Sequence, residues 1–178
     1  MTFLNSFWSR VGTFRKNDEV SVAIETMLMV PIMAWAMLAT LTFFDAYRNE
    51  AIAYKAGLTI ADMISREADS VDDDYIDGAR ELLTFLASDD PQPDLRITSF
   101  RWNENKSKYV RVWSKERGPR SALKTSDLAG MHGILPEMAH GERAILVETW
   151  TDYTPPWDVG LSSRTMATYN VISPRFVT

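Results

Sequence analysis

The stretch VSVAIETMLMVPIMAWAMLATLTFF, residues 20–44, decides the fold of this chain. It contains one ionisable residue, Glu25, and none from Thr26 to Phe44. At about 1.5 Å per residue, a helix over that uncharged part is roughly 28 Å long, close to the hydrocarbon thickness of a bilayer. The stretch therefore predicts one membrane-spanning helix.

Charged residues flank this run unevenly. Arg10, Arg15 and Lys16 precede it, whereas Asp45, Arg48 and Glu50 follow it. Because Lys and Arg near a span stay on the cytoplasmic side, we expect residues 1–19 to form a cytoplasmic arm and residues 45–178 a periplasmic domain. This predicts a single-pass protein of the inner membrane, in contact with its lipid. Trp8 gives the arm an apolar residue that fits the inner membrane surface or a cytoplasmic assembly component.

A cleaved secretory signal is the competing interpretation of the same run. Ala34-Trp35-Ala36 has the small-x-small form of a cleavage site. A cleavage site ends the apolar core of a signal, however, and here mostly apolar residues continue to Phe44. We therefore favour an uncleaved anchor.

Composition excludes several classes of site. The chain has 178 residues, no cysteine and a formal net charge of −5. Disulfides and thiolate metal sites are excluded by the absence of cysteine. The mildly negative charge argues against nucleic acid as a partner, because such binding needs a large basic surface.

Helical periodicity continues beyond the apolar run. Apolar residues recur at intervals of three and four, and they are Tyr47, Ala51, Tyr54, Leu58, Ala61 and Ile64. This stripe predicts an amphipathic extension over residues 45–67 that packs on a folded domain. Gly57 weakens that helix by about 1 kcal/mol relative to alanine.

A second, shorter helix is expected after residue 70. Ser70 followed by three aspartates at 72–74 is typical of a helix start, because a hydroxyl caps free amides and carboxylates favour the positive end of the dipole. Residues 89–93, DDPQP, end the helix and form a linker. Calcium binding by residues 72–74 with Asp77 is a weaker alternative, because the spacing of a calcium loop is missing.

Beyond Pro93 the apolar pattern alternates. It predicts a hairpin whose strands run over residues 95–102 and 109–113, with a turn at 103–106. Two further strands are expected at 143–153 and 164–172. The fold class is therefore α+β, with a long N-terminal helix and a short second helix on an antiparallel sheet of about four strands. Residues 115–142 form either an interaction loop or a mobile loop.

The segment Glu19-Val20-Ser21-Val22-Ala23-Ile24-Glu25-Thr26-Met27-Leu28-Met29-Val30-Pro31 resembles the TadE-like proteins of the tight-adherence (Tad) pilus machinery, a pilin-like family. A glutamate near the start of an apolar helix and a proline six residues later carry the resemblance. Tyr153-Thr154-Pro155-Pro156-Trp157, the run from Ser163 to Tyr169, and Pro174-Arg175 are similar to the family's paired final strands around a Pro-rich loop.

The resemblance implies particular site residues. It implies that Glu25 and Pro31 serve assembly and that Val20-Ser21 is the bond a prepilin peptidase would cut. The family has glycine at the position of Val20 and an aromatic residue at the position of Thr26, so cleavage at this bond is disfavoured. Glu25 would pair with the amino terminus of a neighbouring subunit or with a cation of another membrane protein; snorkelling at the membrane border is the structural alternative.

Catalytic signatures are missing from the sequence. No nucleophile elbow or phosphate-binding glycine loop occurs, and the His132, Glu137 and His140 spacing matches no zinc motif. The tryptophans are expected mainly in the core. We therefore expect no enzyme, no cofactor and no small-molecule substrate.

These features favour a pilin-like single-pass component of Tad pilus biogenesis or secretion. Its expected partners are other pilin-like proteins and the Tad secretion platform, which it meets through protein contacts. The alternative is a membrane-anchored periplasmic sensory or ligand-binding domain, which the same layout allows. A pocket with convergent polar groups would favour that alternative.

Overall fold

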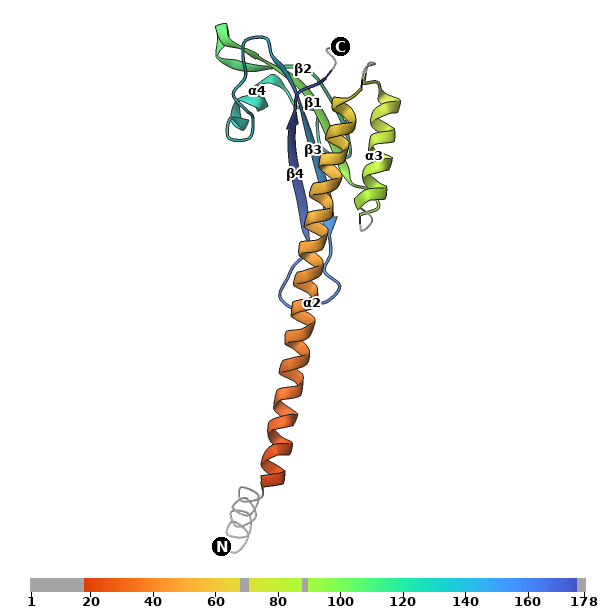
Figure 1. The fold of residues 1–178 in the computed structure, drawn as a ribbon, viewed down its shortest axis with the longest axis vertical. Helices are drawn as coiled ribbons and strands as arrows, with labels where there is room; N and C mark the ends of the chain where they lie inside the picture. The colour runs from red at the N-terminus through yellow and green to blue at the C-terminus, as the bar shows by residue number, and fades with distance from the viewer. Residues whose placement is uncertain (1–17, 68–70, 88–89, 176–178) are drawn as a thin grey trace, which may run out of the picture. The chain divides into compact units, whose positions relative to one another are not determined.

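The computed structural model describes residues 18–67, 71–87 and 90–175, and the side chains of residues 18–21 lie outside this description, as do Trp8 and Ser70. The chain divides into an N-terminal unit, residues 1–44 with 156–161, and an α+β unit, residues 45–155 with 162–178. Helix α2, Asp18–Ser65, is continuous over 48 residues and contributes to both units (Figure 1). The expected long N-terminal helix is confirmed.

The α+β unit contains one antiparallel sheet of four strands in the order β2-β1-β3-β4. The strands are β1 (Asp94–Asn103), β2 (Lys108–Arg117), β3 (Arg143–Tyr153) and β4 (Arg164–Ile172). The hairpin turn between β1 and β2 is the short helix η1, Glu104–Lys106, which Asn103 caps by accepting a hydrogen bond from the Lys106 amide. The predicted α+β class is confirmed, and β3 and β4 have the predicted bounds.

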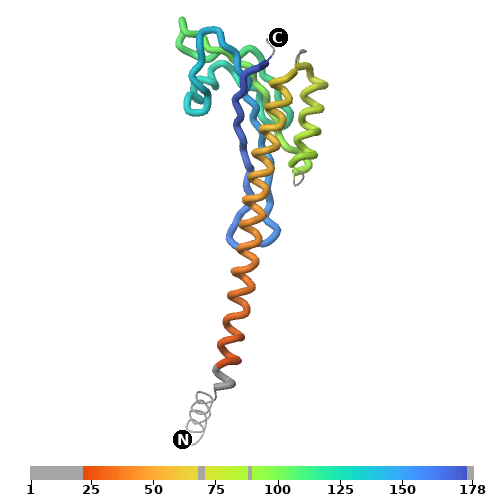
Figure 2. The backbone as a smooth tube through the Cα atoms, viewed as in Figure 1, coloured from red at the N-terminus to blue at the C-terminus, as the bar shows by residue number. Residues whose placement is uncertain are grey.

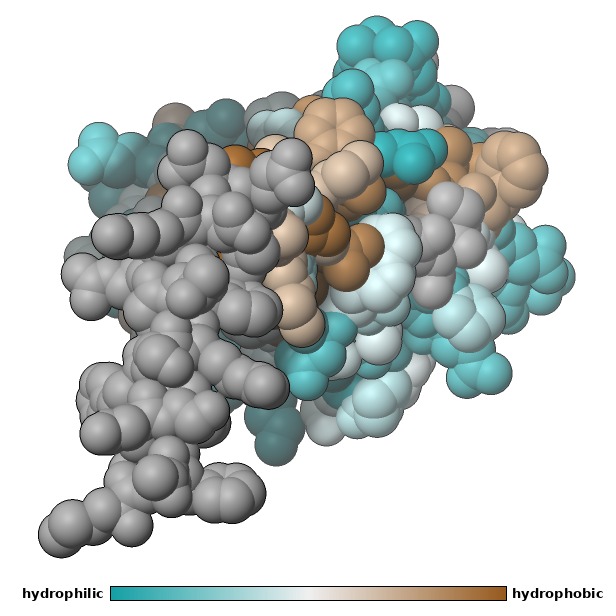
Figure 3. Space-filling model, turned by 90° about the horizontal axis from the view of Figure 1, so that it is seen from below, coloured by the Kyte–Doolittle hydropathy of each residue, from teal (hydrophilic) through white to brown (hydrophobic). Residues whose placement is uncertain are grey.

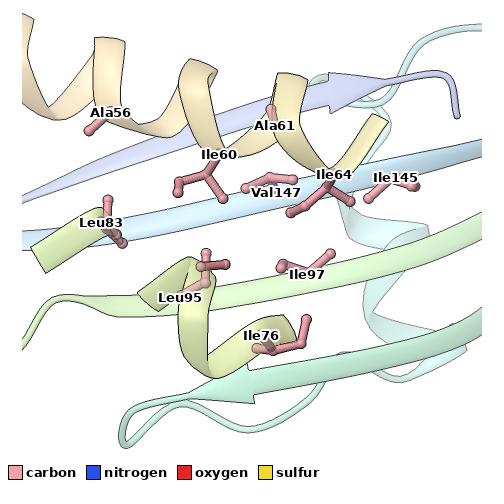
Figure 4. Packing of buried hydrophobic residues seen from close by; sticks show 11 residues of the cluster. Ala56, Ile60, Ala61, Ile64, Ile76, Leu83, Leu95, Ile97, Ile145 and Val147 are labelled. Carbon is pink, nitrogen blue, oxygen red and sulfur yellow. The ribbon is translucent and has the colours of Figure 1, made fainter. Parts of the chain in front are cut away.

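Helices α2 and α3 cover one face of the sheet. Helix α3, Asp73–Ala87, buries Ile76 and Leu83. These residues share a core with Ile60 and Ile64 of α2 (Figure 4). The strands complete that core with Leu95, Ile97, Ile145 and Val147. Burial of such aliphatic side chains, each contributing about 1.5–3 kcal/mol, holds the helices on the sheet.

Small residues bring α2 close to the sheet. Ala53, Ala56 and Gly57 are buried on the sheet side of the helix. A Cβ on Gly57 would lie 2.5 Å from Thr168 Oγ1 and 2.9 Å from Asn170 Nδ2. Gly57 therefore serves close packing, a role that helix propensity alone does not reveal.

The predicted apolar stripe is wrong in its first part. Tyr47, Tyr54 and Leu58 are 72%, 53% and 41% exposed. Only Ala61 and Ile64 of the predicted stripe belong to the core. The small residues of α2 face the sheet because they allow the helix backbone to approach the strands closely. The large tyrosines therefore lie on the outward side of the helix.

The start of α3 is capped by Asp72, whose Oδ1 accepts a hydrogen bond from the Tyr75 amide at 2.8 Å. After α3, the predicted linker includes a buried carboxylate. Asp90 Oδ1 accepts from the Gln92 amide at 2.9 Å, and its Oδ2 accepts from the Asp152 amide at 2.7 Å. Asp90 thus fastens the segment after α3 to the end of β3.

Residues 118–142 supply a second core on the opposite side of the sheet. This segment contains α4, Thr125–Leu128, and η2, Ala129–Met131. Its buried leucines pack with residues of β1, β2 and β3, and the cluster is Phe100, Tyr109, Leu123, Leu128, Leu135, Ala144 and Leu146. The predicted loop began too early, since Lys115–Arg117 belong to β2. Its leucines build core packing that neither a mobile loop nor a pure interaction loop would need.

The tryptophans divide between core and surface. Trp150 is 6% exposed, and Trp102 and Trp113 pack partly buried against the two cores. Trp35 and Trp157 are 57% and 45% exposed, so the expectation of a core position is wrong for both.

Candidate assembly site on helix α2

The apolar segment of α2, residues 22–44, is almost entirely exposed. Within α2, Val22–Ser65 meets the length and composition of a membrane span, and 6% of its most apolar window is buried. Hydrophobic residues gather on the face shown in Figure 3. A core helix of a soluble protein would be mostly buried. The segment is consistent with a single-pass membrane anchor.

Hydroxyl groups in the apolar segment are satisfied within the helix. Thr26, Thr40 and Thr42 each donate through Oγ1 to the carbonyl four residues earlier, at 2.8 Å. Such pairing is needed in hydrocarbon, where no water replaces a missing partner. These threonines are therefore compatible with an apolar surrounding.

Glu25 differs from these threonines, because none of the described residues of the helix pairs with its carboxylate. Its side chain is exposed, and it makes no hydrogen bond or ion pair with any residue among those described. An ionised carboxylate in hydrocarbon costs about 2.5–3.5 kcal/mol on insertion scales. Its position on an exposed surface makes the carboxylate available to a partner outside this chain.

Pro31 lies inside α2, six residues after Glu25. A proline has no backbone N–H, so the carbonyl of Met27 loses its intrahelical donor. The helix continues through this position. Val20 and Ser21 also lie within α2, and their side chains are outside the described part.

One exposed stripe runs along α2 at alternating steps of four and three residues. We call it the heptad stripe, and it consists of Thr26, Val30, Met33, Met37, Thr40, Phe44, Tyr47, Ala51, Tyr54 and Leu58, all exposed. A repeat of 3.5 residues is the geometry by which helices pack side by side. Its part from Tyr47 to Leu58 belongs to the stripe that the sequence predicts to pack on the folded domain, and here these residues are exposed.

We call residues 22–44 the inner half of α2 and residues 45–65 its outer half. A groove lies between this outer half and strand β4, which run side by side (Figures 1 and 2). Its volume is about 640 Å³, and its walls include Tyr47, Tyr54 and Tyr169. Glu50 and Arg164 also line it and form an ion pair at 3.1 Å. The groove is therefore aromatic, with its two charged groups neutralising each other.

Two of the four aspartates considered for calcium, Asp73 and Asp77, pair with cationic side chains. Arg117 pairs with Asp77 and lies 3.4 Å from Asp73 Oδ1, and Lys115 Nζ lies 3.3 Å from the same oxygen. The hydrogen bond from Arg117 holds the pKa of Asp77 below its usual value. These contacts fasten α3 to β2 and engage two of the carboxylates that a calcium ion would need.

The two histidines contact different residues. His140 Nδ1 accepts a hydrogen bond from the Glu104 amide at 3.2 Å, and the ring of His132 lies 5.3 Å from that of Tyr109. Within residues 18–67, 71–87 and 90–175, no group of three His, Asp or Glu side chains is placed to hold a metal ion.

The second face of the sheet carries a buried ion pair that no local sequence pattern predicts. Arg96 donates through Nε to Glu148 Oε2 at 2.6 Å and through Nη2 to Oε1 at 2.8 Å, and Glu148 is 1% exposed. Arg96 and Arg120 also lie over the ring of Trp150, at 5.0 and 4.2 Å from its centre. The sequence predicts a strand around each of these two residues, but only the register brings Arg96 opposite Glu148.

No family model matches the sequence, and neither a curated protein nor a solved structure is significantly similar to it.

Proposed function

We propose that this protein is a pilin-like, single-pass component of a Tad pilus biogenesis or secretion apparatus, acting through protein contacts. One observation carries the proposal. Helix α2 combines an exposed apolar segment, an exposed carboxylate near its start and a firmly packed α+β unit at its other end. The proposed location is the inner membrane, with residues 1–19 cytoplasmic and the α+β unit periplasmic.

Glu25 is the residue that we expect to pair with a neighbouring protein in the proposed assembly. A carboxylate near the membrane border pairs best with a cation at the same depth, such as an amino terminus or a basic side chain of a neighbouring protein. That pairing removes the cost of an isolated charge in hydrocarbon. Glu25 therefore favours lateral contacts between membrane helices.

The heptad stripe supplies the surface for these contacts. Chains inserted in one membrane with the same orientation present parallel helices to each other, and a 3.5-residue repeat keeps one face of such helices in register. Met33 and Met37 offer flexible side chains that adapt to a partner surface. The stripe continues to Leu58, so the proposed contact extends beyond the apolar segment.

The test combines substitution at Glu25 with photo-crosslinking in cells. A photoreactive residue at Met33, on the stripe, is expected to form adducts with pilin-like or Tad membrane proteins. The matched control is Leu28, which is similarly exposed at 64% against 70% for Met33 but lies on the other side of the helix. Glu25→Gln should abolish the Met33 adducts and surface piliation, whereas Glu25→Asp should retain both. Unchanged adducts and piliation in Glu25→Gln, or a native protein found in the cytosol, would contradict the proposal.

A sensory or ligand-binding role is the second candidate, and the groove beside β4 favours it. Its volume of about 640 Å³ falls in the range of small-molecule sites. Native mass spectrometry of the full chain extracted with membrane lipid tests this role. A retained small molecule lost on Tyr54→Ala would support it, and a mass equal to the chain alone would speak against it.

A further inference from the structure

The two edges of the sheet are built differently. Strand β2 carries five charged residues along its length, and they are Lys108, Arg111, Lys115, Glu116 and Arg117. Its pairing with β1 is interrupted by a bulge between Ser99 and Phe100. Charged side chains and bulges are devices that prevent another strand from pairing with an edge.

The β2 edge is also covered by the segment that follows it. The Arg111 amide donates to Thr125 Oγ1 at 3.3 Å, and the Arg111 guanidinium donates to the Leu123 carbonyl at 3.0 Å. The Leu123 amide in turn donates to Ser114 Oγ at 3.0 Å. Residues 123–125 thus occupy the outer side of β2.

Strand β4, with the sequence RTMATYNVI, has none of these devices. Its single charged residue is Arg164 at its first position, and it contains no proline or glycine. Its register with β3 is regular from Arg164 to Ile172. Among the described residues, only β3 pairs with it, so the outer side of this nine-residue strand presents unpaired backbone groups.

The surroundings of this edge are apolar and electrically neutral. Tyr47 and Tyr54 of α2 flank it on one side, and Tyr169 of β4 is 43% exposed. Among the described residues that line the groove, the charged ones are Glu50 and Arg164, and they pair with each other. A neutral partner with apolar side chains therefore fits this surface better than a charged one.

We propose that the outer edge of β4 binds an extended segment of a partner polypeptide as a fifth, antiparallel strand. Backbone groups of an extended chain satisfy those of the edge, while alternate side chains pack on Tyr54 on one side and on Tyr169 on the other. The antiparallel direction follows the rest of the sheet. This interaction goes beyond the proposed role of α2 and depends on a different surface.

A second copy of this chain is less suited to the edge. Its β2 edge is blocked, which leaves β4 itself as the pairing strand. Full antiparallel pairing of two β4 strands sets the charged Arg164 of one copy opposite the apolar Ile172 of the other. The partner is therefore a different polypeptide, with a neutral segment of alternating apolar residues.

A peptide copied from β3, RAILVETWT, serves as the probe, because that sequence already pairs antiparallel with β4 in the native sheet. Hydrogen exchange of the full chain in lipid nanodiscs is measured with and without this peptide. Alternate amides of residues 164–172 are expected to exchange at least tenfold more slowly with peptide, while β2 is unchanged. The same peptide with three consecutive N-methylated amides at its centre should have no effect, because it cannot form the backbone ladder.

Ala167→Lys, on the exposed side of β4, should weaken binding of the peptide at least tenfold. The matched control is Val112→Lys, an exposed position on the blocked β2 edge, and it should leave binding unchanged. If Ala167→Lys lowers the unfolding midpoint, the N-methylated peptide decides the question on the unaltered protein. Equal binding of both peptides, no slowing in β4, or a dimer with protected β4 amides in the absence of peptide would overturn the proposal.

Discussion

The two halves of helix α2 use hydrophobic residues in opposite ways. In residues 22–44 the large side chains are exposed around the helix. In residues 45–65 the buried positions are mostly small or aliphatic, such as Ala53, Gly57 and Ile60, while tyrosines remain outside. The same helix therefore leaves its large side chains exposed in the first half and packs closely on the sheet in the second.

This comparison shows that hydrophobicity alone does not identify the buried face of a helix. In the outer half, the sheet accepts residues that let the backbones approach, because close packing gains dispersion contacts over the whole interface. Tyr47 and Tyr54 are too large for that interface and lie beside it. Each difference between the halves can be tested by matched substitutions.

The largest effect is expected from Ile60→Ala in the outer half. Ile60 is fully buried between α2 and the sheet, so its truncation leaves a cavity and should lower the free energy of unfolding by about 2–5 kcal/mol. Met33→Ala in the inner half should leave that quantity unchanged. Denaturant unfolding followed by the fluorescence of buried Trp150 measures both. Equal destabilisation by the two substitutions would remove the distinction between the halves.

Membrane insertion should be more sensitive to an added charge in the inner half of α2 than in the outer half. Met33→Arg adds about 2.5–3.5 kcal/mol to the cost of inserting the apolar segment into a bilayer. Tyr47→Arg, on the same stripe but outside that segment, should insert normally. Alkaline extraction of membranes separates inserted from released protein, and full retention of Met33→Arg would show that this segment does not lie in hydrocarbon.

Alanine substitutions at two glycines distinguish the effect of close packing from that of helix propensity. Gly57→Ala places a methyl group 2.5 Å from Thr168 Oγ1 and should destabilise the α+β unit by about 1–3 kcal/mol. Gly78→Ala in α3 meets no atom within 4 Å and should stabilise by about 0.5–1 kcal/mol. Thermal unfolding of both variants gives opposite shifts. A stabilising Gly57→Ala would mean that α2 stands farther from β4.

The smallest effect concerns the charges that help to hold α3 beside α2 on the sheet. The pKa of Asp77 is lowered by Arg117, so its folded form favours the carboxylate. The resulting stabilisation is present above the ordinary pKa of aspartate and is lost as the pH falls through the lowered pKa. Asp77→Asn should therefore be less stable than the parent at neutral pH, with a gap that closes in acid.

Stability measured against pH tests this prediction, with Asp74→Asn in the same helical turn as the control. Because Asp77 lies on the surface, salt should also reduce the gap by screening the pair. A gap that is constant with pH would indicate that the substitution acts through packing or the helix start, without a contribution from the carboxylate charge.

Several elements were predictable from sequence because their signals are local. The bounds of β3 and β4 follow from runs rich in Val, Ile, Thr, Tyr and Trp, and the hairpin turn follows from the polar residues 103–106. The helical period of the N-terminal half likewise marks α2. Each of these patterns depends on neighbours within a few residues, which the sequence presents directly.

Only the part of the heptad stripe from Tyr47 to Leu58 was predictable from sequence, and its prediction as a core-facing surface was wrong. Its spacing was correct, yet Tyr47 and Tyr54 face outward because Gly57 and Ala53 fit the sheet more closely. The leucines of residues 118–142 were missed for a related reason, since isolated apolar residues in an irregular segment have no period to reveal burial. Asp90 and Glu148 are buried polar groups whose partners lie 62 and 52 residues away, a distance that no local pattern spans.

The sequence by itself determined the apolar segment with its lone Glu25, the order of helices and strands, and the α+β class, because hydrophobic periodicity and charge are properties of the chain. The tertiary structure alone decided which face of α2 is buried, which edge of the sheet is covered, and that β3 is the one described strand pairing with β4. Those outcomes depend on shape and register between segments that are distant in the sequence. The sequence gives the chemistry of each segment, but it does not show which segments are neighbours in space.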